Sequence, residues 1–183
     1  SGKKIDIIKL SSPNKIKNFN INIPGDISSS AFFIVLTLLS KNSKLIIRHI
    51  NLNPSRLGII KILNKMGAKI KVKNIKNSYG EKCGDIYVKS VKQLKAINCP
   101  ASLNTSAIDE FLIIFLAAAK AKGISYFKNL SELNKKESPR LLLGSKILNM
   151  IGIKNKVTES SIKIFGNPNL KLKKKYEIKN YLK

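Results

Sequence analysis

Apolar residues along the chain fall into runs that predict alternating helices and strands. The two longest, "AFFIVLTLL" (31–39) and "FLIIFLAAA" (111–119), are typical of buried helices. Each is followed by a run rich in strand-forming residues, "SKLIIRHI" (43–50) and "GISYFKNL" (123–130). Both helices are far shorter than the ~20 residues that a membrane-spanning helix needs. The pattern therefore predicts a mixed α/β protein that does not enter a membrane.

The same pattern occurs twice along the chain. The segments "KILNKMGAKI" (61–70) and "KILNMIGIKN" (146–155) share Lys-Ile-Leu-Asn and a glycine, 85 residues apart. Upstream of each lies an arginine preceded by a proline, in "NPSRLG" (53–58) and "SPRLLLG" (138–144). Self-similarity at a fixed spacing indicates one supersecondary unit that is used more than once.

Short strand-like runs complete each unit. They are 19–23, 68–74 and 85–90 in the first half, and 95–98, 153–159 and 161–166 in the second. We therefore predict an α/β (α+β) fold of two β-α-β-α-β-β units, over 19–92 and 93–167. Residues 1–18 are expected to be an overhang from a preceding segment, and 168–183 the Lys-rich start of a third unit. Because the chain starts with Ser and the tail does not complete that unit, we expect a piece of a longer protein.

Polar residues mark the four predicted helix starts. The candidate caps are Asp26 with three serines, Asn53 with Pro54, Ser106 three residues before Asp109, and Ser138 with Pro139. If the two units are related by a rotation, their equivalent helix N-termini should face the same end of the molecule. Helix N-termini carry partial positive charge, so several of them around one cleft would make a site for anions.

The chain is strongly basic, with 35 Lys and Arg against 10 Asp and Glu and a net charge of +25. This charge favours one alternative function, a basic nucleic-acid-binding module, for which the tail at 170–183 is the best support. The lysines are scattered through every segment, however, and only three cations are arginine: Arg48, Arg56 and Arg140. Arginine suits phosphate recognition better than lysine does. We therefore predict no nucleic-acid partner and read the lysines as codon bias of an AT-rich genome.

Metal and disulfide chemistry find little support in the sequence. Cys83 and Cys99 have no metal-ligand spacing, and His49 is the single histidine. We predict no metal site, no role for His49, and a reducing, cytoplasmic setting.

Half of the acids lie at the predicted helix entrances: Asp26, Asp109, Glu110, Glu132 and Glu137. The last of these acids, Glu137, lies between Lys136 and Arg140, close to a predicted helix start. Such a Lys-Glu-x-x-Arg cluster can hold a carboxylate or phosphate and can also move a proton.

Each of these residues also has a purely structural explanation. Helix capping alone would account for Asp109, Lys136 is one of 32 lysines, and Glu137 would favour the helix dipole. Arg140 is harder to explain in this way because the chain uses arginine so rarely. Arg56 occupies the matching position of the first half and is equally unusual.

Five stretches together resemble the C-terminal half of the 5-enolpyruvylshikimate-3-phosphate synthase family. They are "IPGDISSSAFF" (23–33), "LNPSRLG" (52–58), "MGAKI" (66–70), "SAIDEF" (106–111) and "KESPRL" (136–141). The likeness runs from about residue 19 to residue 167. A relative of UDP-N-acetylglucosamine enolpyruvyl transferase is the second choice, because that family shares the fold but lacks the Lys-Glu-Ser-x-Arg run.

The resemblance implies a fold and a reaction. The fold is a pair of domains, each of three β-α-β-α-β-β units, of which this chain would supply two units of one domain. The reaction transfers the enolpyruvyl group of phosphoenolpyruvate to the 5-hydroxyl of shikimate 3-phosphate, with release of phosphate and without metal or cofactor. The complete protein is expected to be a monomer.

The resemblance also implies roles for four residues. Asp109 matches the acid that contacts the shikimate hydroxyls and accepts a proton, and Lys136 matches the lysine that bonds the 5-hydroxyl. Glu137 matches a glutamate that handles a proton at the methylene carbon, and Arg140 matches the arginine that grips phosphoenolpyruvate.

The chain departs from the family pattern at two positions. Pro139 stands where the family usually has Asp, and Asn134 where it has Arg. The family's N-terminal Lys-Ser motif and its later Asp-His-Arg motif are absent from these 183 residues. We therefore expect this chain alone not to turn over substrate.

Overall fold

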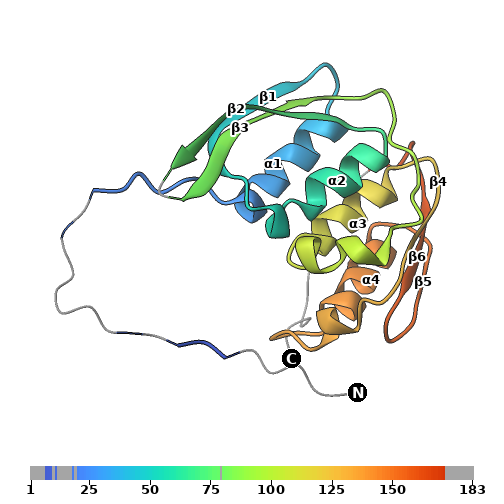
Figure 1. Cartoon of the computed structure of the whole chain (residues 1–183). Helices are drawn as coiled ribbons and strands as arrows, with labels where there is room; N and C mark the ends of the chain where they lie inside the picture. Colours follow the sequence, from blue (N-terminus) through green and yellow to red (C-terminus); the bar gives the residue numbers. More distant parts are fainter. Residues whose placement is uncertain (1–6, 10, 12–17, 19, 79, 172–183) are drawn as a thin grey trace.

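The computed structural model describes residues 7–9, 11, 18, 20–78 and 80–171 of the chain (Figure 1). Most of the predicted overhang at 1–18 and of the Lys-rich tail at 170–183 lies outside the described residues. Within them, no helix is long and apolar enough to cross a membrane.

Within the described residues, the first half contains two α-helices, a short 3-10 helix and a three-stranded sheet. In chain order these are α1 (Ile27–Leu39), β1 (Lys44–Asn51), η1 (Pro54–Arg56), α2 (Gly58–Lys65), β2 (Lys69–Ser78) and β3 (Glu81–Lys89). The strands lie in the order β1-β3-β2, and both neighbouring pairs are antiparallel.

The second half repeats this arrangement. It contains η2 (Ala101–Leu103), η3 (Thr105–Ala107), α3 (Phe111–Ala119), β4 (Gly123–Phe127), η4 (Ser131–Asn134), α4 (Arg140–Met150), β5 (Asn155–Val157) and β6 (Ile162–Gly166). Its sheet has the order β4-β6-β5 and is again antiparallel. The two halves therefore share one strand order, and the fold class predicted from the repeat is confirmed.

The repeated Lys-Ile-Leu-Asn segment ends a helix in the same way in both halves. Gly67 and Gly152 follow α2 and α4 with φ of 91° and 83°, a left-handed conformation that L side chains rarely adopt. The asparagine of each repeat then binds the strand that follows. Asn64 pairs with the backbone of Ile70, and Asn149 accepts a hydrogen bond from the Asn155 side chain.

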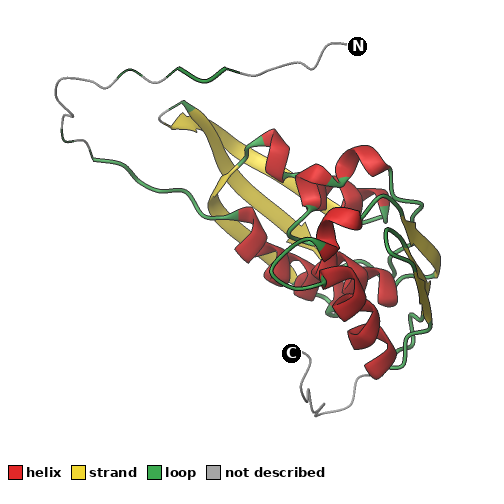
Figure 2. Ribbon diagram, turned by 90° about the horizontal axis from the view of Figure 1, so that it is seen from below, coloured by secondary structure: helices red, strands yellow, loops and turns green. Residues whose placement is uncertain are grey.

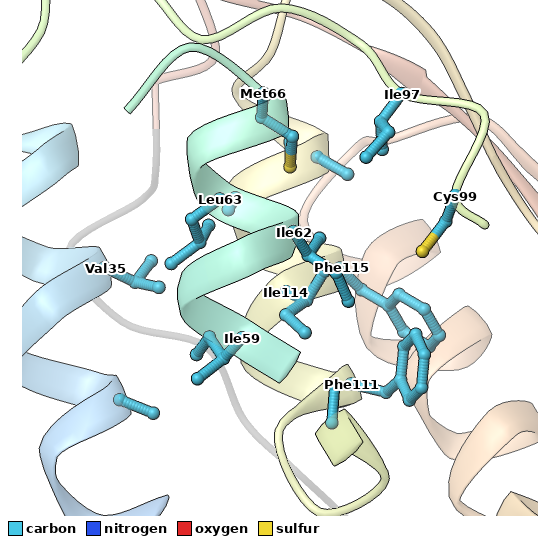
Figure 3. Packing of buried hydrophobic residues seen from close by; sticks show 14 of the residues in the cluster. Val35, Ile59, Ile62, Leu63, Met66, Ile97, Cys99, Phe111, Ile114 and Phe115 are labelled. Carbon is cyan, nitrogen blue, oxygen red and sulfur yellow. The ribbon is translucent and has the colours of Figure 1, made fainter. Parts of the chain in front are cut away.

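The four helices pack together, and each sheet lies against the helices of its own half (Figures 1 and 2). This arrangement follows from the pattern of burial, because α1 and α3 bury nearly continuous apolar faces. Buried side chains of both halves form one continuous core. Figure 3 shows α2 in this core, with Ile59, Ile62 and Leu63 packed near Val35 and Ile114. The two units are therefore held together by a shared interior.

One apolar surface of the helices remains exposed. On α1, Phe32 and Phe33 are each 61% exposed and Leu36 is 63% exposed; Leu112 and Ile147 on α3 and α4 are also partly exposed. Exposed apolar surface of this kind is typical of a contact surface.

The two predicted opening strands are not formed as strands. Residues 20–23 have no regular structure, and Ile23 is 78% exposed, so among the described residues no strand covers its side chain. Residues 95–98 make two isolated parallel bridges, at Lys95 and Asn98, to the segment around β4. Two separated bridges are too few to extend the ladder of that sheet.

The predicted caps of the first half are confirmed in part. Asp26 caps α1, since its Oδ2 accepts the backbone N–H of Ser29 at 2.7 Å. Asn53 caps the 3-10 helix η1, which begins with Pro54, instead of capping α2 directly.

The predicted caps of the second half are wrong. The hydroxyl of Ser106 donates to the carbonyl of Leu103, because residues 105–107 form a 3-10 turn and α3 begins only at Phe111. At the start of α4, Ser138 makes no cap bond through its side chain, and Pro139 precedes the first helical residue.

Candidate functional site

The carboxylate of Asp109 faces three cations. Its Oδ1 lies 3.5 Å from Lys136 Nζ and 3.3 Å from Arg140 Nη1, and its Oδ2 lies 3.6 Å from Arg56 Nη1. About a third of the Asp109 side chain is accessible to solvent. Together with Asp26, Ser28, Glu110 and Glu137, these four residues form what we call the helix-end cluster.

A turn between η3 and α3 determines how Asp109 is presented. Within this turn Asp109 points to the surface, whereas Glu110 is only 3% exposed. The preceding helix η3 is brought against the first half at Gly58, where an added Cβ would lie 2.5 Å from the backbone carbonyl of Ser106. Because glycine allows this close approach, η3 lies beside the start of α2.

The segment before α4 supplies Lys136, Glu137 and Arg140. It is anchored by η4, where Leu133 is buried and the Asn134 amide donates to the carbonyl of Glu159 at 3.0 Å. Asn134, which replaces the arginine expected from the family pattern, therefore has a structural hydrogen bond here.

Arg140 begins α4 and is held by two carboxylates. Its Nη2 donates to Glu137 Oε2 at 2.9 Å, and its Nη1 donates to Asp109 Oδ1 at 3.3 Å. Pro139 cannot supply the carboxylate expected at its position. The guanidinium nevertheless keeps two acidic partners, so the departure at 139 does not leave it without orientation.

The first half contributes Arg56 from η1. Its Nη2 donates to Ser28 Oγ at 2.8 Å and lies 3.9 Å from Asp26 Oδ1. The Ser28 hydroxyl in turn donates to the carboxylate of Glu110. The cluster thus links residues at the starts of α1, η1, α3 and α4, and the prediction that these helix ends share one end of the molecule is confirmed.

The environment shifts the pKa of three acids in the cluster. Burial raises the pKa of Glu110, and the Ser28 hydrogen bond and the charge of Arg56 offset only part of this effect. Partial burial would raise the pKa of Asp26, but hydrogen bonds from Ser29 and Ser28 and the charge of Arg56 together outweigh it, so the pKa is lowered. The pKa of Glu137 is lowered by its own backbone N–H and then by Arg140.

The arrangement suits the reversible binding of anions. The ion pairs are partly exposed, and such pairs contribute little to stability, about 0–1 kcal/mol each. An anionic ligand can therefore replace a protein carboxylate as the partner of Lys136 or Arg140 at low energetic cost. Among the residues that the structure describes, no His, Cys, Asp and Glu side chains group as a metal-binding set.

The structure brings together all four site residues predicted from the sequence: Asp109, Lys136, Glu137 and Arg140. Sequence reasoning gave no role to Arg56, Ser28 or Glu110. The rarity of arginine drew attention to Arg56, and the acids at helix starts included Glu110. Nothing in the local sequence indicates that Ser28 would bridge them.

Solved structures identify the class of fold. The chain is similar to an EPSP synthase from Acinetobacter baumannii, with a TM-score of 0.78 and 39% identity over 80% of this chain and 33% of that one. It also resembles the enolpyruvyl transferase NikO from Streptomyces tendae, with a TM-score of 0.54 and 14% identity, a likeness of fold alone. The fold is that of the enolpyruvyl transferases.

The sequence comparisons narrow this class to one family. The family model of EPSP synthase (3-phosphoshikimate 1-carboxyvinyltransferase) matches residues 3–176, so the chain belongs to the EPSP synthase family. A 3-phosphoshikimate 1-carboxyvinyltransferase of Ruthia magnifica is 40% identical over 169 residues, which are 90% of this chain and 39% of that protein. One of Legionella pneumophila (strain Corby) is 44% identical over 147 residues, or 80% of this chain and 34% of the relative. The chain thus spans little more than a third of these relatives, and neither alternative weighed from the sequence is favoured.

Proposed function

We propose that the complete protein transfers the enolpyruvyl group of phosphoenolpyruvate to the 5-hydroxyl of shikimate 3-phosphate and releases phosphate. Family membership supports the reaction class. The observation that carries the assignment to this site is the Asp109 carboxylate, 3.5 Å from Lys136 and 3.3 Å from Arg140. A base beside two cations is what an attacking hydroxyl and two anionic substrates require.

Each residue of the site has a role in this proposal. The hydroxyl oxygen of shikimate 3-phosphate bonds to the central carbon of phosphoenolpyruvate, and Asp109 accepts the hydroxyl proton. At the same time a proton adds to the methylene carbon. Lys136 binds the same hydroxyl, and Glu137 moves the methylene proton. Arg140 binds the phosphoenolpyruvate carboxylate, for which its planar guanidinium is better suited than lysine. The proton that was added at the methylene carbon is then lost together with phosphate, which completes the transfer.

The rest of the substrate contacts are assigned to parts of the protein that this chain does not contain. The chain spans 39% of one relative and 34% of another. We therefore expect the 183 residues alone to show no synthase activity. The complete enzyme is proposed to act as a monomer. It is also proposed to act in the cytoplasm, and this location fits the free, buried thiols of Cys83 and Cys99.

Substitutions in the complete protein test the proposal. Asp109→Ala and Lys136→Met should each lower kcat by at least about 100-fold, because both residues act on the reacting hydroxyl. Lys135→Met is the matched control, since this neighbouring lysine is 70% exposed and pairs with Glu132 instead. Wild-type rates in the Asp109 and Lys136 variants would show that these residues have only structural roles.

A further inference from the structure

Arg56 contacts the proposed base from the opposite half of the chain. The two cations that share Asp109 Oδ1, Lys136 and Arg140, both come from the segment before α4. Arg56 comes from η1 and faces the other carboxylate oxygen, Oδ2, at 3.6 Å. The two oxygens of one carboxylate are thus held by different repeat units.

The position of Arg56 is fixed by contacts that involve neither Lys136 nor Arg140. Its Nη2 donates to Ser28 Oγ at 2.8 Å, and the Ser28 hydroxyl donates to the buried carboxylate of Glu110. Asp26 adds a second, more distant carboxylate at 3.9 Å. The backbone is also restrained, since Arg56 ends a 3-10 helix that begins with Pro54 and is capped by Asn53.

We propose that Arg56 is a positioning residue that holds Asp109 Oδ2 while Lys136 and Arg140 bind the anionic substrates. This inference rests on the proposed function, which makes Asp109 the base and gives the other two cations to the substrates. When those cations turn to substrate oxygens, Asp109 loses partners at Oδ1, the oxygen that must face the reacting hydroxyl. Arg56 keeps the carboxylate in place from the other side, and misplacement of a catalytic group by about 1 Å can lower a rate about 100-fold.

Arginine is specifically suited to this role. Its planar guanidinium places one nitrogen on Asp109 and the other on Ser28 at the same time. The single ammonium of lysine cannot span both partners in this geometry. Arg56→Lys should therefore keep the charge but recover only part of the positioning.

The test is steady-state kinetics of the complete protein with phosphoenolpyruvate and shikimate 3-phosphate. Arg56→Ala should lower kcat about tenfold or more, with both KM values within about threefold of wild type, because the transition state and not substrate binding is affected. The kcat of Arg56→Lys should lie between those of wild type and Arg56→Ala. Millimolar guanidinium should restore part of the kcat of Arg56→Ala. The control is Arg48→Ala, an exposed arginine on β1 outside the cluster, which should behave as wild type and show no rescue.

The outcomes separate this inference from the proposed function. A wild-type kcat in Arg56→Ala, beside an inactive Asp109→Ala, overturns the positioning role alone. An unchanged kcat with a raised KM overturns it as well, because Arg56 would then bind substrate. Full activity in Asp109→Ala refutes the proposed function itself. If Arg56→Ala does not fold, Arg56→Lys and Ser28→Ala test the positioning role instead. Both variants keep a positive charge at position 56, and both should lower kcat without raising KM.

Discussion

The close approach at Gly58 is expected to make this position intolerant of any side chain. Gly58 is the first residue of α2, and a Cβ there would lie 2.5 Å from the backbone carbon and oxygen of Ser106. Backbone atoms cannot rotate away as a flexible side chain can. Gly58→Ala must therefore push α2 and the η3 turn apart, and that turn carries Asp109 three residues further on.

The size of the effect follows from two opposing contributions. Overpacking a close contact costs roughly 1–3 kcal/mol, and replacing glycine by alanine in a helix returns about 0.5–1 kcal/mol. We expect a net loss of about 1–2 kcal/mol in the free energy of unfolding, or a Tm lower by about 2–8 °C for a domain of this size.

Gly144→Ala provides the matched comparison. This glycine lies inside α4, and its added Cβ would meet side-chain atoms of Leu112 and Phe115 at 3.0 and 3.1 Å. Side chains can move by a few tenths of an ångström, so the helix gain should nearly offset the cost and leave stability within about 1 kcal/mol of wild type.

Urea unfolding of the 183-residue chain, followed by circular dichroism, measures both variants. The Gly58→Ala midpoint should fall clearly below those of wild type and Gly144→Ala, with unchanged m-values. If Gly58→Ala is as stable as wild type, the two backbones do not approach as closely as described, and this contact does not hold Asp109 beside Arg56.

Three further predictions concern other parts of the molecule. Because burial raises the pKa of Glu110, the folded chain binds this proton more readily than the unfolded chain, and stability is lost as pH rises from about 4.5 through the raised value. Glu110→Gln should therefore gain stability relative to wild type as pH rises through that window, and a constant difference in urea midpoints from pH 4 to pH 8 would contradict this. Phe115→Ala should lower the free energy of unfolding by about 3–5 kcal/mol, because the centroid of its ring lies 5.3 Å from that of Phe127 in the core. A urea midpoint near that of wild type would show that the core is not packed as described. The double change Phe32→Ser and Leu36→Ser should reduce binding of a hydrophobic dye to this chain with little loss of stability, because both side chains are more than 60% exposed; undiminished dye binding would place the apolar surface elsewhere.

Much of the fold could be predicted from local patterns in the sequence. The apolar run at 111–119 predicted that α3 is a buried helix, and the repeated Lys-Ile-Leu-Asn segment predicted that both halves share one arrangement. These features depend on the spacing of apolar residues and on glycine at a left-handed position, both of which act over a few residues. Charge and residue rarity at helix starts likewise indicated Asp109, Lys136, Glu137 and Arg140.

The helix starts show where local reasoning was insufficient. Ser106 and Asp109 have the spacing of a capping box, but the chain forms a 3-10 turn at 105–107 and delays α3 to Phe111. Ala107 in this 3-10 turn and Glu110 in the turn that follows it are both buried against the rest of the molecule, and this packing prevails over the local capping preference. The turn at 108–110 also exposes Asp109, so the error in the cap and the position of the candidate base have one cause.

The sequence by itself determined the order of the four helices and of the strands that follow them, the repeat, and four polar residues near helix ends. Only the tertiary structure decided that Asp109 would be shared between the two halves, with Arg56 on one oxygen and Lys136 and Arg140 on the other. These contacts join residues far apart in the chain, and they form because the apolar faces of all four helices pack into one core. Local patterns carry no information about such distances; the packing of the helices determines them, together with Gly58, which allows the close approach of Ser106.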